Sequence, residues 1–302
     1  MIYLTKDDFD NLILSKLKEN SSFIEQFSEL YKLSSALHIF TRKIYTYINQ
    51  NEQTNLFISA MSIFHRYRIC SNFSLSKYSS EELYIILGAC LFIAQKATNI
   101  LGRSLDYLSK FIQQLILKKE QNKKIEINEI ANKIKEIEME ILISIGFNIY
   151  TDFPFPFFNK IKTFLSNSII NLDNFITLLN YFIKDSFILP LSLYYTPNVI
   201  TISCLVILKQ KYNLKNINLK EFISLSEYNL DEGEIKECAS LIQKLEAAIL
   251  ETKMNQKNNN INNNYINNNK ILTNTNINNT NTMNSEEASV TKIIPSIKMN
   301  IN

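Results

Sequence analysis

Residues 83–97 read LYIILGACLFIAQKA. If this stretch is helical, its apolar side chains point in nearly every direction, which is typical of a helix that is buried on all sides. The preceding residues 79–82 read SSEE, a capping signal for the start of a helix. The sequence therefore predicts a central, buried helix around which other helices pack.

The composition of the chain favours helices throughout. The chain has 302 residues, of which 46% are apolar, and this is enough for one or two domains with sizeable cores. It has only 4 glycines and 5 prolines. An all-β fold needs turn residues about every 8–12 positions, and the chain cannot supply them. The glycine-rich turns of a nucleotide-binding sheet are absent as well. The predicted fold class is all-α.

Helical spacing predicts two groups of about five helices. Gly146 is a stop signal for a helix, and Pro154 and Pro156 enforce a break after it. The expected helices of the first group are residues 33–48, 55–69, 83–97, 105–118 and 127–145, and those of the second group are residues 157–165, 172–188, 197–212, 219–226 and 231–250.

The chain is expected to divide into four parts. Residues 1–30 form an N-terminal segment with a short helix that starts near Thr5, and residues 31–150 and 151–252 form the two helical groups. Residues 253–302 form a tail that is dominated by asparagine. Because the tail has little periodic apolar content, burial cannot offset its conformational entropy, and we expect it to be disordered.

The two helical groups share a short similar string. Residues 89–93 read ACLFI and residues 203–207 read SCLVI, and each string falls in the third helix of its group. In each group this third helix is the most apolar one. The matching order makes an internal duplication plausible.

Charge and cysteine content bound the partners and the location. The formal net charge is +3 and the basic residues are dispersed, which argues against nucleic acid as a direct partner. The four cysteines form no CxxC pair, and Cys90 and Cys204 lie in apolar helical runs, so we expect reduced thiols in the core. The N-terminus turns acidic at Asp7, unlike a signal peptide, and no apolar run of about 18 residues predicts a membrane span. We expect a nuclear location, with the cytoplasm as the alternative.

The sequence offers no constellation for catalysis. It contains two histidines, His38 and His65, which are too few for a histidine-rich metal site, and no nucleotide-binding or hydrolase motif is present. The carboxylates of Glu136, Glu138 and Glu140 are typical of a solvated helix face. The prediction is a protein that is not an enzyme and that needs no metal, cofactor or small-molecule ligand.

Four motifs, taken in order, resemble the cyclin family with its double cyclin box. The string ACLFIAQK at residues 89–96 is similar to the signature of the third helix of a cyclin box, and EMEILISIGFNI at residues 138–149 is similar to that of the fifth helix. IFHRY at residues 63–67 resembles the end of the second helix, and YTP at residues 195–197 resembles the start of the third helix in the second box.

This resemblance implies a protein that binds and activates a cyclin-dependent protein kinase. In the family, a lysine and a glutamate hydrogen-bond to the kinase around its movable regulatory helix, and by position these are Lys96 and Glu138. Ile93 and Ala97 share the helix face of Lys96, and Leu142 shares that of Glu138. Lys96 and Glu138 could also pair with each other in the free protein. The expected kinase-binding residues are Lys96, Glu138, Ile93, Ala97, Leu142, Phe147 and Ile149.

Some details point to the transcription-type cyclins of the K, T and L kinds. YLTKDD at residues 3–8, IGFNI at residues 145–149 and YYTP at residues 194–197 resemble these cyclins. ALHIF at residues 36–40 lacks the substrate-docking patch of the cell-cycle class. The chain departs from the family after Lys96, where residues 97–99 read ATN in place of acidic residues.

Two other functions stay open on the sequence alone. General transcription factors of the TFIIB kind use the same double box to bind nucleic acid, although this chain has no zinc ribbon and no basic face. A helical scaffold that never activates a kinase is the other alternative, and the departure after Lys96 keeps it open.

Overall fold

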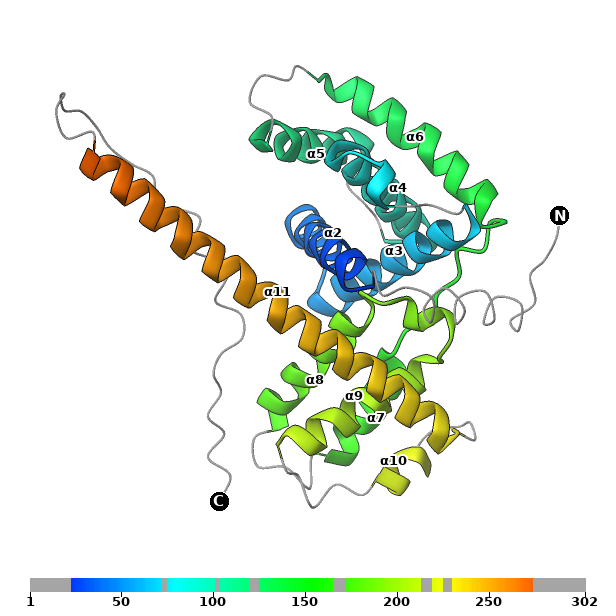
Figure 1. The fold of residues 1–302 in the computed structure, drawn as a ribbon. Coiled ribbons are helices and arrows are strands. Elements are labelled where there is room, and N and C mark those ends of the chain that lie inside the picture. The colour runs from blue at the N-terminus through cyan, green and yellow to red at the C-terminus, as the bar shows by residue number, and fades with distance from the viewer. Residues whose placement is uncertain are drawn as a thin grey trace. The chain divides into compact units, whose positions relative to one another are not determined.

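The computed structural model describes residues 23–71, 75–100, 104–119, 125–165, 172–212, 219–224 and 230–273. These residues form ten α-helices and two 3₁₀ helices, with no strand among them (Figure 1). The chain divides into two compact units, residues 1–252 and residues 253–302. The helix expected near Thr5 lies outside the described residues.

The described helices form two sets of five, which confirms the all-α prediction. The first set is α2 (Phe23–Ile44), α3 (Gln50–Cys70), α4 (Ser80–Ala97), α5 (Leu105–Lys119) and α6 (Ile127–Ser144), with the 3₁₀ helix η1 (Leu75–Lys77). The second set is α7 (Phe155–Leu165), α8 (Leu172–Ser186), α9 (Pro197–Lys211), α10 (Leu219–Ser224) and α11 (Glu232–Thr273), with η2 (Pro190–Leu193).

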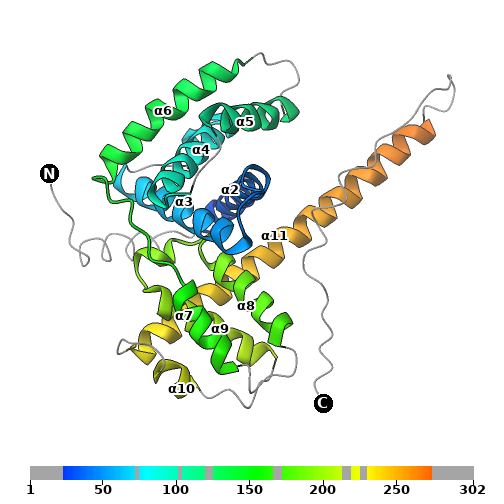
Figure 2. The ribbon, with the colours of Figure 1, turned by 180° about the vertical axis from the view of Figure 1, so that it is seen from behind.

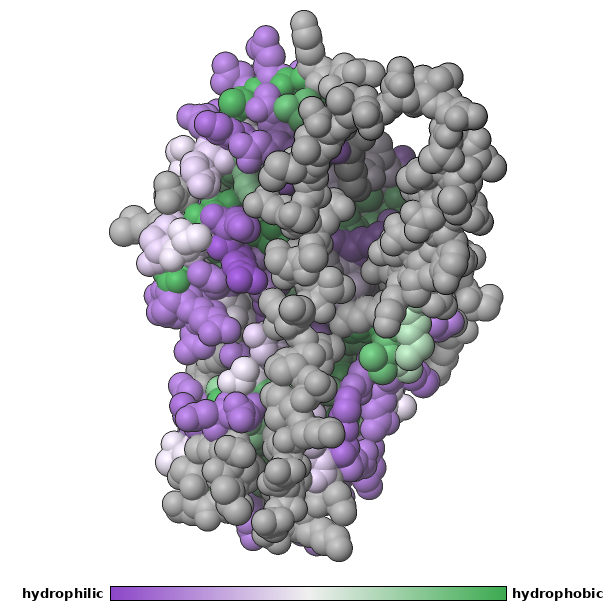
Figure 3. Space-filling view, turned by 90° about the vertical axis from the view of Figure 1, so that its left-hand side faces the viewer, coloured by the Kyte–Doolittle hydropathy of each residue, from purple (hydrophilic) through white to green (hydrophobic). Residues whose placement is uncertain are grey.

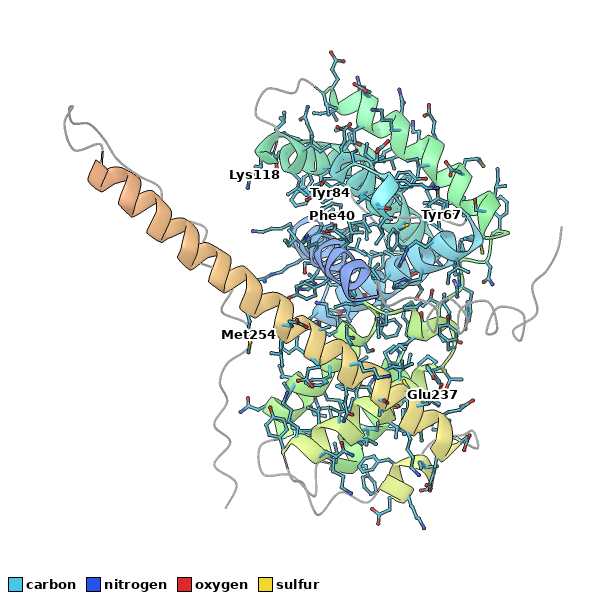
Figure 4. All side chains as sticks on the ribbon, in the orientation of Figure 1. Phe40, Tyr67, Tyr84, Lys118, Glu237 and Met254 are labelled. Carbon is cyan, nitrogen blue, oxygen red and sulfur yellow. The ribbon has the colours of Figure 1, made fainter. Side chains whose placement is uncertain are left out.

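Helix α4 is the centre of the first set. The hydroxyl of Ser79 accepts a hydrogen bond from the backbone N–H of Glu82, whose carboxylate accepts the N–H of Ser79 in return, so the predicted capping box is present. α4 packs against α2, α3, α5 and α6, and both views of the ribbon place it among them (Figures 1 and 2). Phe40 of α2 and Tyr84 of α4 lie next to each other, with ring centroids 6.2 Å apart (Figure 4).

Gly88 lies where α4 meets α5 and α6. A Cβ atom at this position would lie 2.5 Å from Cδ1 of the buried Ile112 on α5 and 3.6 Å from Cδ1 of Ile134 on α6. The missing side chain therefore lets the neighbouring side chains approach the α4 backbone, which a larger residue would prevent.

Helix α9 occupies the corresponding place in the second set. Thr196 caps it, with Pro197 at its first turn, as the order of the two residues predicts. α9 packs against α7, α8 and α10. Cys204 of α9 and Cys90 of α4, the matching positions of the two similar strings, are both fully buried.

Three helices differ most from the expected bounds, and one of them is α3, which begins at Gln50 where residue 55 was expected. α2 begins at Phe23, earlier than the expected residue 33, because the buried Leu30 extends its apolar face. α11 continues to Thr273, although the asparagine-rich segment from residue 253 was expected to be disordered. The physical reason is that extending a helix adds one hydrogen bond per residue, whereas starting one is costly. Residues 274–302 lie outside the described part of the chain.

The described part of the surface is coloured by hydropathy in Figure 3. On the face seen in Figure 3, the described surface is largely hydrophilic, and hydrophobic side chains show only in small patches. Among the described helices, none combines the length and the apolar content that crossing a membrane requires.

The two sets of helices meet at the middle of α3. The Nε2 atom of His65 lies 3.2 Å from the carbonyl oxygen of Phe187, which can only accept a hydrogen bond, so Nε2 carries the proton. The hydroxyls of Ser62 and Ser192 are 3.0 Å apart. His65 is 2% exposed, and burial, followed by the charge of Arg68, lowers its pKa to about 3.

The buried His65 predicts that acid weakens the fold. The unfolded chain binds a proton here at the ordinary pKa of 6.5 while the folded chain does not until about 3. The free energy of unfolding should therefore fall as the pH falls through this window, by about 2 kcal/mol between pH 6.5 and pH 5 for this residue. The variant His65→Gln keeps a side-chain donor, but its amide does not titrate. Urea unfolding at the two pH values should show that its free energy of unfolding falls less than that of the unchanged protein, by about that amount. If the free energy of unfolding falls equally in both proteins, His65 is not the source of the pH dependence.

Candidate functional site

An ion pair joins the end of α4 to the middle of α6. The Nζ atom of Lys96 lies 2.6 Å from Oε1 of Glu138, and the side chains of Lys96 and Glu138 are 53% and 12% exposed. The same Nζ lies 4.1 Å from the ring centroid of Phe92, one helical turn earlier, in cation–π geometry. Two residues that the sequence singled out separately are thus brought together at the surface.

Helix α6 presents this pair because it is amphipathic. Ile130, Ile134 and Ile141 are buried and fix the face of α6 that packs on the first set. Glu138 lies at the edge of that face, beside α4. The hydroxyl of Tyr67 on α3 donates a 2.5 Å hydrogen bond to Oε1 of Glu140 and ties α6 to α3.

Helix α6 ends in a Schellman motif. The backbone N–H of Phe147 donates to the carbonyl of Leu142 at 2.8 Å, and the N–H of Gly146 donates to the carbonyl of Ile143 at 3.1 Å. Gly146 has φ +58°, which a glycine adopts without cost, so the predicted stop at this residue is confirmed. Phe147 also has a positive φ, +59°, which a bulky side chain rarely adopts.

The segment after α6 is tied to α3. The guanidinium of Arg66 donates from Nη1 to the backbone carbonyl of Asn148 at 3.0 Å. This bond holds the chain on both sides of Asn148, and so positions Phe147 and Ile149 relative to α3. The string IFHRY at residues 63–67 therefore supplies contacts in two directions, with His65 towards the second set and Arg66 towards the end of α6.

Large apolar side chains are exposed around the end of α6. Of the nine exposed large apolar residues among the described ones, four lie between positions 139 and 150, namely Met139, Ile143, Phe147 and Tyr150. Met139, Ile143 and Phe147 are spaced four apart, so the first two share a helix face. Exposed apolar side chains that gather in this way mark an interaction surface.

The predicted site residues do not all lie at the surface. Phe147 is 62% exposed, whereas Leu142 and Ile149 are half-buried. Ala97 is half-buried beside Lys96. Ile93 is only 2% exposed and packs beneath this surface.

Sequence reasoning missed Met139, Ile143 and Tyr150. The spacing of Met139 and Ile143 against the buried Ile134 and Ile141 could have shown that they point away from the core.

The described residues contain no cluster of side chains that could hold a metal ion, and three of the four cysteines are buried. They contain no group of three or more His, Cys, Asp or Glu side chains that could hold a metal ion. All four cysteines are unpaired, and Cys90, Cys204 and Cys238 are buried. Burial raises the pKa of the Cys90 and Cys204 thiols well above the ordinary value, so neither is a nucleophile in the folded chain.

The fold is similar to that of a viral cyclin from herpesvirus saimiri. That structure is 15% identical in sequence, and the match covers 78% of this chain and 95% of that chain with a TM-score of 0.50. The CAK complex of Chaetomium thermophilum bound to ATP-γ-S also matches, at 14% identity over 72% of this chain and 64% of that chain, with a TM-score of 0.42. No protein-family model and no curated protein sequence matches. The chain has the cyclin fold, as the ordered motifs predicted.

The Lys96–Glu138 pair should contribute little to the stability of the free protein. Lys96 is half exposed, so water screens the attraction between the two charges. Lys96→Ala should change the free energy of unfolding by less than about 1 kcal/mol, and a double-mutant cycle with Glu138→Ala should give a coupling of the same size. Urea unfolding measures both quantities. A coupling several times larger would show that the pair serves the fold.

Replacing Phe147 with glycine should stabilise the folded protein. Its positive φ costs energy that glycine does not incur, and its exposed ring has little packing to lose. Phe147→Gly should raise the free energy of unfolding by about 0.5–1 kcal/mol. Tyr150→Gly is the control, because Tyr150 is exposed nearby without a positive φ and should lose stability. A loss of stability in Phe147→Gly would contradict the inference that the backbone of Phe147 is strained.

Proposed function

We propose that this protein is a cyclin, a regulatory subunit without catalytic activity that binds and activates a cyclin-dependent protein kinase. The observation that carries the proposal is the Lys96–Glu138 pair beside the exposed apolar side chains at the end of α6. The fold shared with a viral cyclin supports it. The kinase-binding face consists of Lys96, Ala97, Glu138, Leu142, Phe147 and Ile149, with Ile93 packed beneath it.

The chemistry of this face suits an interface. Apolar anchors around a pair of charged hydrogen-bonding groups are typical of the centre of a tight interface. Because Lys96 and Glu138 satisfy each other in the free protein, neither is left unpaired before the kinase binds. On binding, each can exchange or share its partner with polar groups of the kinase.

Activation follows from selective binding. A kinase is active only when the ion pair between its β3 lysine and its αC glutamate is formed. A rigid partner that binds this arrangement better than the inactive one shifts the kinase towards it. The packing of α4 and α6 against each other, with Gly88 at their meeting point, gives the face that rigidity.

We further propose a nuclear role in transcription or RNA processing. This step rests on the resemblance of residues 3–8, 145–149 and 194–197 to the transcription-type cyclins. The fold is common to all cyclin classes and does not distinguish between them.

Purified protein should bind a cyclin-dependent kinase and raise its activity. Lys96→Ala or Glu138→Ala should each weaken binding by about 2–5 kcal/mol, because each change leaves a charged interface group unpaired. Phe147→Gly should also weaken binding although it stabilises the free protein. Isothermal titration with candidate kinases, together with a kinase assay, measures these effects.

Glu136→Ala and Lys110→Ala are matched controls. Glu136 lies on α6 and Lys110 on α5, both are exposed, and neither belongs to the proposed face. Both controls should bind the kinase like the unchanged protein. If no cyclin-dependent kinase is bound or stimulated, the proposed function is wrong. If a kinase is stimulated but Lys96→Ala and Glu138→Ala leave its affinity unchanged, only the assignment of the face is wrong.

A further inference from the structure

Helix α6 carries two exposed apolar side chains on the side that faces away from the core. Met139 is 55% exposed and Ile143 is 63% exposed, and we call them the outer stripe of α6. Both views of the ribbon place α6 at the edge of the first helical set (Figures 1 and 2). Of the nine exposed large apolar side chains among the described residues, five have no hydroxyl group, and three of these five are Met139, Ile143 and Phe147. Purely apolar exposed surface is thus concentrated at this end of α6.

The outer stripe borders the proposed kinase-binding face. Successive residues of an α-helix are turned by about 100° around its axis. Measured from the buried Ile141, Glu138 and Leu142 therefore lie at about 60° and 100°. Met139 and Ile143 follow at about 160° and 200° in the same direction. The stripe is therefore a continuation of the face around α6.

The proposed face by itself offers little apolar surface to a partner. Phe147 is its one large apolar side chain that is exposed. The other apolar members of the face are buried or half-buried, namely Ile93, Ala97, Leu142 and Ile149. A stable protein–protein interface buries roughly 800 Å² of each partner, around a centre rich in apolar side chains. A partner that binds this face stably needs more apolar contact than the face supplies.

The outer stripe is the apolar surface within reach of such a partner. The backbone N–H of Phe147 donates to the carbonyl of Leu142, so Phe147 begins beside the last turn of α6, which also carries Ile143. Met139 lies one turn before Ile143 on the same side of the helix. A partner that covers the ring of Phe147 therefore approaches both side chains of the stripe.

We infer that the kinase of the proposed function also covers the outer stripe, and that Met139 and Ile143 select which kinase is bound. The inference rests on the proposed function, because it assigns a second part of the same interface. The kinase surface opposite the stripe is apolar, since a charged group placed there would lose its water and gain no partner. On its far side the stripe ends at Glu140, an exposed carboxylate that accepts the hydroxyl of Tyr67 and forms a polar rim.

The variants Met139→Gln and Ile143→Gln test the stripe, because glutamine suits a helix but removes the apolar contact. Leu250→Gln and Met254→Gln are matched controls. Leu250 and Met254 lie on α11, are 44% and 64% exposed, and belong to neither the face nor the stripe. Urea unfolding checks that each variant folds, and the two stripe variants are read independently, so one result stands if the other variant does not fold.

Surface plasmon resonance against a panel of purified cyclin-dependent kinases measures the affinity and both rate constants. Each stripe variant should weaken binding about tenfold or more, because apolar surface that the kinase covers is lost. Each control should change the affinity by less than about twofold. The loss in the stripe variants should be a faster dissociation that does not vary with salt concentration, since no charge is removed.

The outcomes separate this inference from the proposed function. If the unchanged protein binds no cyclin-dependent kinase, the proposed function is wrong and the inference falls with it. If it binds one and both stripe variants bind that kinase equally well, the inference alone is overturned. It is also overturned if the two controls weaken binding as much as the stripe variants do. Sedimentation of the protein alone tests the other occupant. If the unchanged protein dimerises, Ile143→Gln is monomeric and its kinase affinity is unchanged, a second copy covers the stripe and the inference is wrong.

Discussion

The burial of α4 on all sides is the constraint on which the first helical set depends. A helix with no polar face must be covered by other helices, and α2, α3, α5 and α6 cover it. Gly88 fixes how closely the side chains from α5 and α6 approach it. Lys96 lies in the last turn of α4, where the helix reaches the surface, so the position of its ammonium follows from the packing of the whole helix. The same core sets the face of α6 and with it the position of Glu138.

Features that depend on local pattern were predictable from the sequence. The capping box at Ser79, the buried run of α4 and the stop at Gly146 are each encoded within a few residues, and the structure contains all three. The pairing of Lys96 with Glu138 needed the family resemblance as well, because the two residues lie 42 positions apart. Without it, a lysine at a helix end and one glutamate among three would have indicated only a solvated surface.

Features that depend on how helices pack were not predictable. The contact between His38 and Lys184 joins residues 146 positions apart on different helical sets, and no local pattern encodes it. The positive φ of Phe147 runs against the preference of its own side chain, so propensity predicts the opposite. The continuation of α11 to Thr273 reflects propagation from a stripe of buried residues that begins at Ile235, whereas asparagine content alone predicts disorder.

The proposed kinase-binding face collects features that do not help the free protein. Phe147 combines an unfavourable backbone conformation with an exposed aromatic ring, and Met139 and Ile143 expose apolar surface beside it. The ion pair of Lys96 and Glu138 lies where water weakens it. Strain and exposed apolar surface persist in natural proteins chiefly where function requires them, since substitutions that remove them are easily found. Their coincidence at the end of α6, on a core packed tightly enough to hold them in place, is accounted for by a partner that covers them.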